Sequence, residues 1–151
     1  MVIFLPAYLR CELAEWWASF KGERERLRTL YPHLPEAVSE GMKGWKVAHP
    51  EPKVALEDVL QHIDHIRSRI GAEHIGLGGD FDGMGSAPEG LEDVSKYPNL
   101  VAALFDRGYS EMEIRGIVGL NALRVMSGVE ATAKKLSAIP PEETPALHWV
   151  E

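Results

Sequence analysis

Two short apolar segments have the pattern of buried strands, and a long helical stretch separates them. The first is Met-Val-Ile-Phe-Leu at residues 1–5, where Pro6 ends the run because proline removes a donor from a strand ladder. The second is His-Ile-Gly-Leu-Gly-Gly at residues 74–79. Strands joined by helical crossovers pair in parallel, which predicts an α/β fold. Two strands are too few for a stable sheet of this kind, so we expect the chain to be part of something larger.

The segments around the strands have the spacing of amphipathic helices. The clearest helix covers residues 55–70, with Gly71 at its end and an expected core face of Leu56, Val59, Leu60, Ile63, Ile66 and Ile70. Further helices are predicted over 12–30, from Pro35, from Pro98 to Gly108, from a capping box of Ser110 and Glu113 with Ile114, Ile117 and Val118 inward, and over 121–136. We expect one structured unit over 1–136 and an irregular tail, rich in Pro and Glu, over 137–151.

The composition argues against some classes of binding partner and indicates the cell compartment. The chain has 151 residues and a net charge of -7 without a basic face, which argues against a nucleic-acid partner. No apolar run reaches the roughly 18 residues of a membrane span, and the opening lacks the basic residues of a signal peptide. A single cysteine, Cys11, forms no internal disulfide and fits a reducing compartment, so we expect a cytoplasmic protein without membrane contact.

The strand at 74–79 runs into Asp80-Phe81-Asp82-Gly83, the segment with the most chemical interest. Carboxylates at the C-terminal end of a strand occupy the place where α/β folds build active sites. Alternation along an extended chain would direct Asp80 and Asp82 to the same side. A turn stabilised by aspartate is an equally good interpretation. An EF-hand is excluded because Met84 and Leu91 replace oxygen ligands, and Phe81 occupies the third glycine position of a dinucleotide fingerprint.

Other chemistry-bearing residues favour structural interpretations. His62 and His65 are spaced three apart on the 55–70 helix, which would suit a metal site only if further ligands were near. We interpret them as helix-surface residues beside the Ile63/Ile66 stripe. Cys11 is interpreted as a small apolar residue, since no activating partner is evident. The aromatic residues Trp16, Trp17, Phe20 and Trp45 are predicted to pack together.

Several motifs together resemble the renal (membrane) dipeptidase family of zinc metallopeptidases. They are His-Ile-Asp-His-Ile at 62–66, Gly-Ala-Glu-His-Ile-Gly-Leu-Gly-Gly-Asp-Phe-Asp-Gly at 71–83, and Gly-Leu-Glu-Asp-Val-Ser-Lys-Tyr-Pro-Asn-Leu at 90–100. Gly-Leu-Asn-Ala-Leu-Arg-Val at 119–125 resembles the Asn-x-Leu-Arg-Val ending of the family, and residues 1–4 resemble its seventh barrel strand. The insert from Glu12 to Pro52 resembles the bacterial branch. The resemblance covers nearly the whole chain.

The resemblance implies a (β/α)8 TIM barrel of the amidohydrolase type, in which a binuclear zinc centre hydrolyses dipeptides. Asp80 corresponds to the catalytic aspartate after strand eight, which handles the proton passed to the leaving amine. Tyr8 corresponds to a substrate-binding tyrosine after strand seven, and Leu5 replaces a second one. Asp82, Gly79 and Gly83 are candidates for shaping the loop. The family's zinc ligands correspond to none of the residues present, so no metal is expected in this chain alone.

The resemblance predicts the C-terminal portion of a zinc dipeptidase, consisting of strands seven and eight with their helices. We expect a dipeptide as the substrate of the complete enzyme and no activity from the chain alone. The alternative is a non-catalytic module that associates with itself, or one half of a split enzyme. Its partner would then be a second copy or a separate N-terminal half.

Overall fold

The computed structural model describes residues 1–139 of the chain. Two short parallel strands, β1 (Val2–Ile3) and β2 (Leu77–Gly78), pair with Val2 opposite Leu77 and Ile3 opposite Gly78. The ladder extends beyond the two pairs, because the Val2 N–H donates to Gly76 O at 2.7 Å and the Phe4 N–H to Gly78 O at 3.2 Å. The predicted parallel pairing is therefore confirmed. Both strands are shorter than predicted. At the start of the second, His74 belongs to the 3-10 turn η1 (Ala72–His74) and not to the strand.

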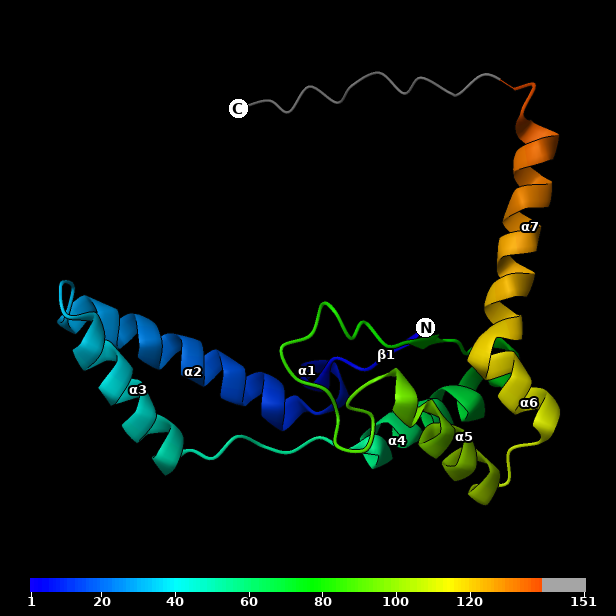
Figure 1. Ribbon diagram of the computed structural model, residues 1–151. Coiled ribbons are helices and arrows are strands. Elements are labelled where there is room, and N and C mark those ends of the chain that lie inside the picture. Colours follow the sequence, from blue (N-terminus) through cyan, green and yellow to red (C-terminus); the bar gives the residue numbers. More distant parts are fainter. Residues whose placement is uncertain (140–151) are drawn as a thin grey trace.

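The connection from β1 to β2 is helical throughout most of its length. A single helical turn, α1 (Pro6–Leu9), follows the first strand after two intervening residues. Proline fits this place because the first helical residue needs no N–H partner. The long helix α2 (Cys11–Leu30) and α3 (Pro35–Ala48) then form a hairpin, and α4 (Leu56–Ile70) leads back to η1. Figure 1 shows the hairpin extending to one side of the remaining elements.

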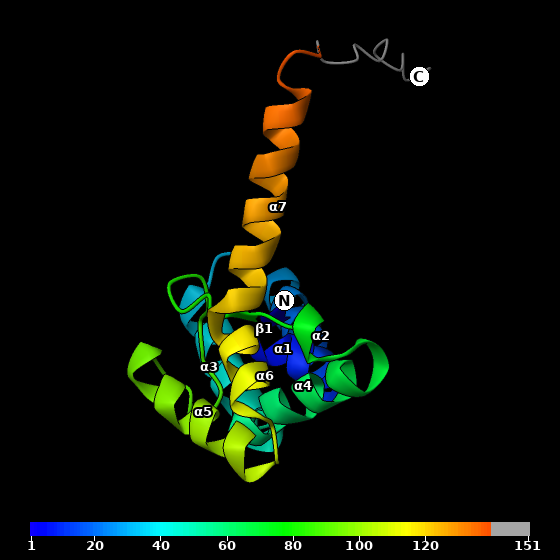
Figure 2. The same ribbon diagram turned by 90° about the vertical axis from the view of Figure 1, so that its right-hand side faces the viewer.

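The second half of the described chain is also helical. It comprises the 3-10 turn η2 (Val94–Lys96), α5 (Tyr97–Asp106), α6 (Glu111–Arg115), the π-helical turn η3 (Gly116–Leu120) and α7 (Asn121–Leu136). The capping box before α6 is confirmed, because the Ser110 N–H donates to Glu113 Oε2 at 2.8 Å and the Glu113 N–H to Ser110 Oγ at 3.3 Å. No residue of α7 is buried, and Figure 2 shows this helix standing clear of the others.

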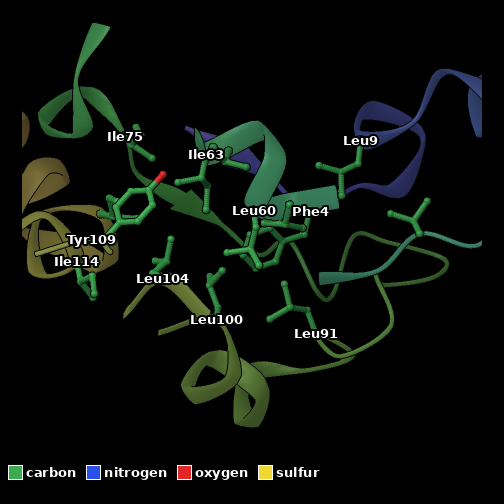
Figure 3. Packing of buried hydrophobic residues seen from close by; sticks show 14 of the residues in the cluster. Phe4, Leu9, Leu60, Ile63, Ile75, Leu91, Leu100, Leu104, Tyr109 and Ile114 are labelled. Carbon is green, nitrogen blue, oxygen red and sulfur yellow. The ribbon is translucent and has the colours of Figure 1, made fainter. Parts of the chain in front are cut away.

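The core lies where α4, α5 and α6 cover the strand pair. Its fully buried side chains include Phe4, Ile63, Ile75, Leu91, Leu100 and Leu104 (Figure 3). Every one of these residues belongs to a segment adjoining or covering β1 or β2. The strands therefore form the centre of the packing, although they contribute few residues to it.

Two side chains predicted to face the core are exposed instead. Ile70 is the last residue of α4 and is 56% exposed. Val118 is 46% exposed although Ile117 beside it is fully buried, and the helical winding is interrupted at the next residue, Gly119, whose φ of 176° and ψ of -41° are not helical. Cys11, expected to be a small apolar packing residue, is exposed at the start of α2.

No helix within the described part of the chain is both long and apolar enough to cross a membrane. The predicted irregular tail over 137–151 falls mainly on residues 140–151, which lie outside the described residues.

Candidate functional site

Asp80 occupies an unusual backbone conformation at the carboxyl end of β2. Its φ of 49° makes it the one residue other than glycine in the left-handed region between residues 1 and 139. Side chains of L-residues crowd the backbone there, and such conformations concentrate at functional sites. The Gly83 N–H closes a turn by donating to Asp80 O at 3.0 Å. The chain therefore bends at Asp80, and the prediction that an extended segment directs Asp80 and Asp82 to one side is wrong.

The two glycines next to this turn are required by close approaches. A Cβ at Gly83 would lie 2.6 Å from Asp80 Oδ1, so the carboxylate rests directly over the glycine backbone. A Cβ at Gly79 would lie 2.7 Å from Phe81 Cε2 and 3.0 Å from Tyr97 Oη. Gly79 therefore has no room for a side chain, because the Phe81 ring is packed on the core, whereas a side chain at Gly83 would have to displace the exposed Asp80 carboxylate.

An aromatic cluster fixes the turn to the core. Phe81, Phe4 and Tyr97 contact one another, and the Phe81 ring centroid lies 6.0 Å from that of Phe4 and 6.1 Å from that of Tyr97. Both contacts have the edge-to-face geometry that aromatic pairs favour. Burial raises the pKa of Tyr97 above its ordinary value. The packing of Phe81 therefore fixes the backbone next to Asp80, while the Asp80 carboxylate itself stays exposed.

Asn121 fixes the chain on the other side of β2. From the first residue of α7, its Nδ2 donates to Ala72 O at 2.9 Å and to Ile75 O at 2.8 Å. These carbonyls lie just before β2, so one amide group sets where the strand begins. Reasoning from the residues did not identify this role, and the only signal was that Asn121 lies in the 119–125 motif.

The carboxylates of Asp80 and Asp82 are both exposed, and neither takes part in a hydrogen bond or ion pair with any residue from 1 to 139. In contrast, the Ser95 side chain and the Ser95 N–H, which donates to Asp93 Oδ1 at 2.7 Å, lower the pKa of the Asp93 carboxyl in the same loop region. Asp93 therefore serves as a helix cap, whereas Asp80 and Asp82 remain available to a substrate.

Tyr8 lies on α1, which follows β1. Because β1 and β2 are parallel, α1 and the Asp80 turn both follow the carboxyl ends of their strands. The Tyr8 side chain is 67% exposed and lines a hollow of about 190 Å³ with residues of β1 and with His62 and Ile66. Asp80 is not part of that hollow. The segments of Tyr8 and Asp80 thus both follow the carboxyl ends of the two strands, but the two residues do not line the same cavity.

The two histidines of α4 have different surroundings. His62 is half-buried, and its Nε2 lies 3.1 Å from Leu9 O, so it links α4 to α1. His65 is exposed. Within residues 1–139, no three His, Cys, Asp or Glu side chains come close enough together to hold a metal ion. The described residues therefore do not form a zinc site by themselves.

Comparisons with known proteins agree on one family. Residues 1–140 match the sequence profile described as Membrane dipeptidase (Peptidase family M19). Dipeptidase tcpJ of Claviceps purpurea is 45% identical over 97 residues, which are 64% of this chain and 23% of that protein. Dipeptidase ataJ of Aspergillus terreus is 55% identical over 80 residues, covering 53% of this chain and 20% of that protein. The chain thus spans between a fifth and a quarter of the length of these curated relatives.

A solved structure supports the same relationship. The protein described as the probable dipeptidase PvdM from Pseudomonas aeruginosa superposes with a TM-score of 0.56 and is 26% identical. The match covers 81% of this chain and 34% of that one. The arrangement of helices around β1 and β2 is therefore that of about one third of a larger protein.

Proposed function

The chain belongs to the membrane dipeptidase family, peptidase family M19, and we propose that it takes part in the hydrolysis of dipeptides. The match over residues 1–140 and the relatives named dipeptidases support this function. In the proposed architecture, β1 and β2 are strands seven and eight of a (β/α)8 barrel of the amidohydrolase type. Their parallel pairing across a helical crossover supports that assignment.

The observation that carries the proposal is the left-handed backbone of Asp80 at the carboxyl end of β2. Active sites of TIM barrels lie at this end of the strands. In the proposed reaction, Asp80 accepts a proton from the attacking water and delivers it to the nitrogen of the leaving amine as the peptide C–N bond breaks. Its exposed carboxylate, free of partners within the described residues, is available for both transfers. Tyr8 contacts the substrate, and Asp82, Gly79 and Gly83 shape the loop.

The family resemblance implies two zinc ions, but the described residues do not fit such a centre. Residues outside this part of the chain would have to hold the metal. The proposal therefore assigns proton transfer to Asp80 and no metal-binding role to residues 1–139.

The test is a chimera in which this chain replaces the matching segment of dipeptidase tcpJ. Hydrolysis of a panel of dipeptides by the chimera, and its loss in the Asp80→Asn chimera, would support the proposal. A folded chimera that binds zinc but hydrolyses no dipeptide accepted by tcpJ would contradict it. The chain alone, assayed with added zinc, is expected to be inactive.

The strand pair also supports a second candidate, a module that associates with a second copy or with a separate N-terminal half. Each strand has one partner within the described residues, so each also has an edge with free backbone groups. Such edges are templates for pairing with another chain. The exposed apolar residues of α7, which include Leu123, Met126 and Val129, add surface that association would cover.

A further inference from the structure

The hairpin of α2 and α3 encloses a hollow of about 750 Å³ near its connecting loop. Its floor is apolar and is formed by Phe20 on α2 and by Val38 and Met42 on α3, with Pro32 and Pro35 at the loop. A volume of this size lies within the range that accommodates small organic ligands. The hairpin extends away from β1 and β2 (Figure 1), so this hollow is separate from the Asp80 turn.

The rim of the hollow is cationic. Arg24 and Arg28 of α2 line it on one side, Lys43 and Lys46 of α3 line it on the other, and no carboxylate is among the lining residues. This gathering of positive charge occurs on a chain whose net charge is -7. Like charges around one hollow repel one another, and an anion placed among them would remove that repulsion.

Two of the four cations are already paired. Arg28 lies 2.7 Å from Glu25 Oε1, and Lys43 lies 3.1 Å from Glu40 Oε2. Arg24 and Lys46 have no carboxylate within ion-pair distance among residues 1–139. The Lys46 ammonium lies 5.1 Å from the centroid of the Phe20 ring, directly above the apolar floor. The free cations and the apolar floor therefore meet at Phe20.

We propose that this hollow binds an anionic amphiphile, a carboxylate attached to an aliphatic body. The aliphatic part packs on Phe20 and Met42, and the carboxylate lies between Arg24 and Lys46. The apolar floor distinguishes such a ligand from an inorganic anion, and the two cations without an ion pair, Arg24 and Lys46, distinguish it from a neutral hydrocarbon. The inference does not depend on the proposed peptidase function, because it uses no residue of β1, β2 or the Asp80 turn.

Octanoate is a suitable probe, and methionine methyl groups report where it binds. The chain has five methionines: Met42 is buried at the floor of the hollow, whereas Met112 and Met126 are 83% and 58% exposed elsewhere. In the full chain labelled with carbon-13 at the methionine methyls, octanoate is expected to shift the Met42 signal saturably and to leave Met112 and Met126 unchanged. Met42→Leu assigns the signal. Equal shifts at all exposed methionines, or none at Met42, would overturn the proposal.

A neutral ligand tests whether the cations contribute to binding, and an inorganic anion tests whether the apolar floor does. Octanol, which has the same chain length without the charge, is expected to bind at least about tenfold more weakly than octanoate. Inorganic phosphate alone is expected to cause no saturable shift at Met42. Equal binding of octanol would show that the cations play no part. Saturable binding of phosphate at comparable affinity would show an anion site without need of an apolar body.

Charge variants locate the carboxylate. The double variant Arg24→Gln/Lys46→Gln is expected to weaken octanoate binding about tenfold, the loss expected for two exposed charge-assisted contacts. Lys21→Gln/Lys134→Gln is the matched control, since it also removes two exposed cations that have no ion pair within residues 1–139, and neither of them lines the hollow. Equal weakening by both variants would indicate a general effect of net charge and would contradict the assigned site.

Discussion

The side-chain amide of Asn121 donates a hydrogen bond of 2.8 Å to the carbonyl oxygen of Ile75, two residues before β2. The same Nδ2 also donates to Ala72 O at 2.9 Å. One side chain at the start of α7 thus satisfies two carbonyls of the segment that leads into the strand. Since Asp80 lies two residues after the end of β2, we expect the position of the candidate catalytic carboxylate to depend on this contact.

Asn121→Ala is expected to lower the free energy of unfolding by about 1–3 kcal/mol, because two carbonyls lose a shared donor. Asn121→Asp keeps the shape but directs oxygen at both carbonyls, and it should be at least as destabilising. Asn99→Ala is the matched control, since the exposed Asn99 makes a single bond of 3.3 Å to Gly90 O. Urea denaturation at one fixed protein concentration measures all three. A loss at Asn99 equal to that at Asn121 would contradict the assignment.

The core contains a buried phenol whose ionisation should affect stability. Tyr109 is 3% exposed, and its hydroxyl donates to Asp64 Oδ1 at 2.7 Å, with the Arg67 guanidinium 4.1 Å from the ring centroid. Burial, followed by the hydrogen bond to Asp64, raises the pKa of Tyr109 above its ordinary value. The unfolded chain releases this proton near pH 10, whereas the folded chain keeps it.

The contribution of Tyr109 is therefore complete below about pH 10 and is lost as the pH rises toward the folded pKa. Tyr109→Phe should cost about 1–2 kcal/mol at neutral pH, and the gap between the variant and the native chain should shrink above pH 10. Denaturation curves across pH 7–11 measure the gap, with Tyr31→Phe as the exposed control. A gap that stays constant across this range would show that Tyr109 ionises alike in both states.

Local sequence pattern predicted most helices because their signals lie within one or two turns. The apolar spacing over 55–70, Pro35 before α3 and the Ser110–Glu113 capping box each specify an element from neighbouring residues. The errors lie at a helix end and at a break in the helical winding. Ile70 is exposed as the last residue of α4, and Val118 is exposed next to Gly119, whose backbone is not helical.

The candidate site was predictable in position but not in geometry. The glycines and carboxylates after the second strand indicated where chemistry would lie, and the fold places them at the end of β2. The left-handed backbone of Asp80 was not predictable, since it depends on contacts between distant segments. Phe81 packs on Phe4, and Asn121 binds Ile75, so residues far apart in the sequence determine the turn.

Asp80→Asn tests the proposed proton transfer in the tcpJ chimera. The amide keeps the shape of the side chain but cannot accept the proton, so kcat should fall by about 10²–10⁴-fold. Zinc content, measured in the same preparation, should be unchanged because Asp80 is not proposed as a main metal ligand. Asp82→Asn is the matched control and should have the smaller effect. A larger loss at Asp82 would reassign the catalytic carboxylate.

The purified chain is expected to hold no stoichiometric zinc. Tight structural or catalytic zinc needs three or four nitrogen, sulfur or oxygen ligands converging on one point, and no such group exists within residues 1–139. Elemental analysis after dialysis against a weak chelator measures the content. About two tightly held zinc ions per chain would overturn this prediction. His62→Ala and His65→Ala would then show whether α4 contributes ligands.

The final prediction concerns association. The strand pair leaves a free edge on β1 and on β2 within the described residues, and α7 has no buried residue. Unpaired strand edges and contiguous apolar surface both favour contact with another chain. We therefore expect a homo-oligomer in micromolar solution, or aggregation where no closed arrangement forms.

Light scattering measures the mass of the species in solution. Met126→Lys, which places a charge on the exposed apolar surface of α7, should shift the distribution toward smaller species. Met112→Lys is the control, because Met112 is also an exposed methionine but lies on α6. The helices themselves should persist in every species, since their caps and core contacts are local. A monodisperse monomer with one cooperative thermal transition would contradict the prediction and show that the α4, α5 and α6 core is sufficient alone.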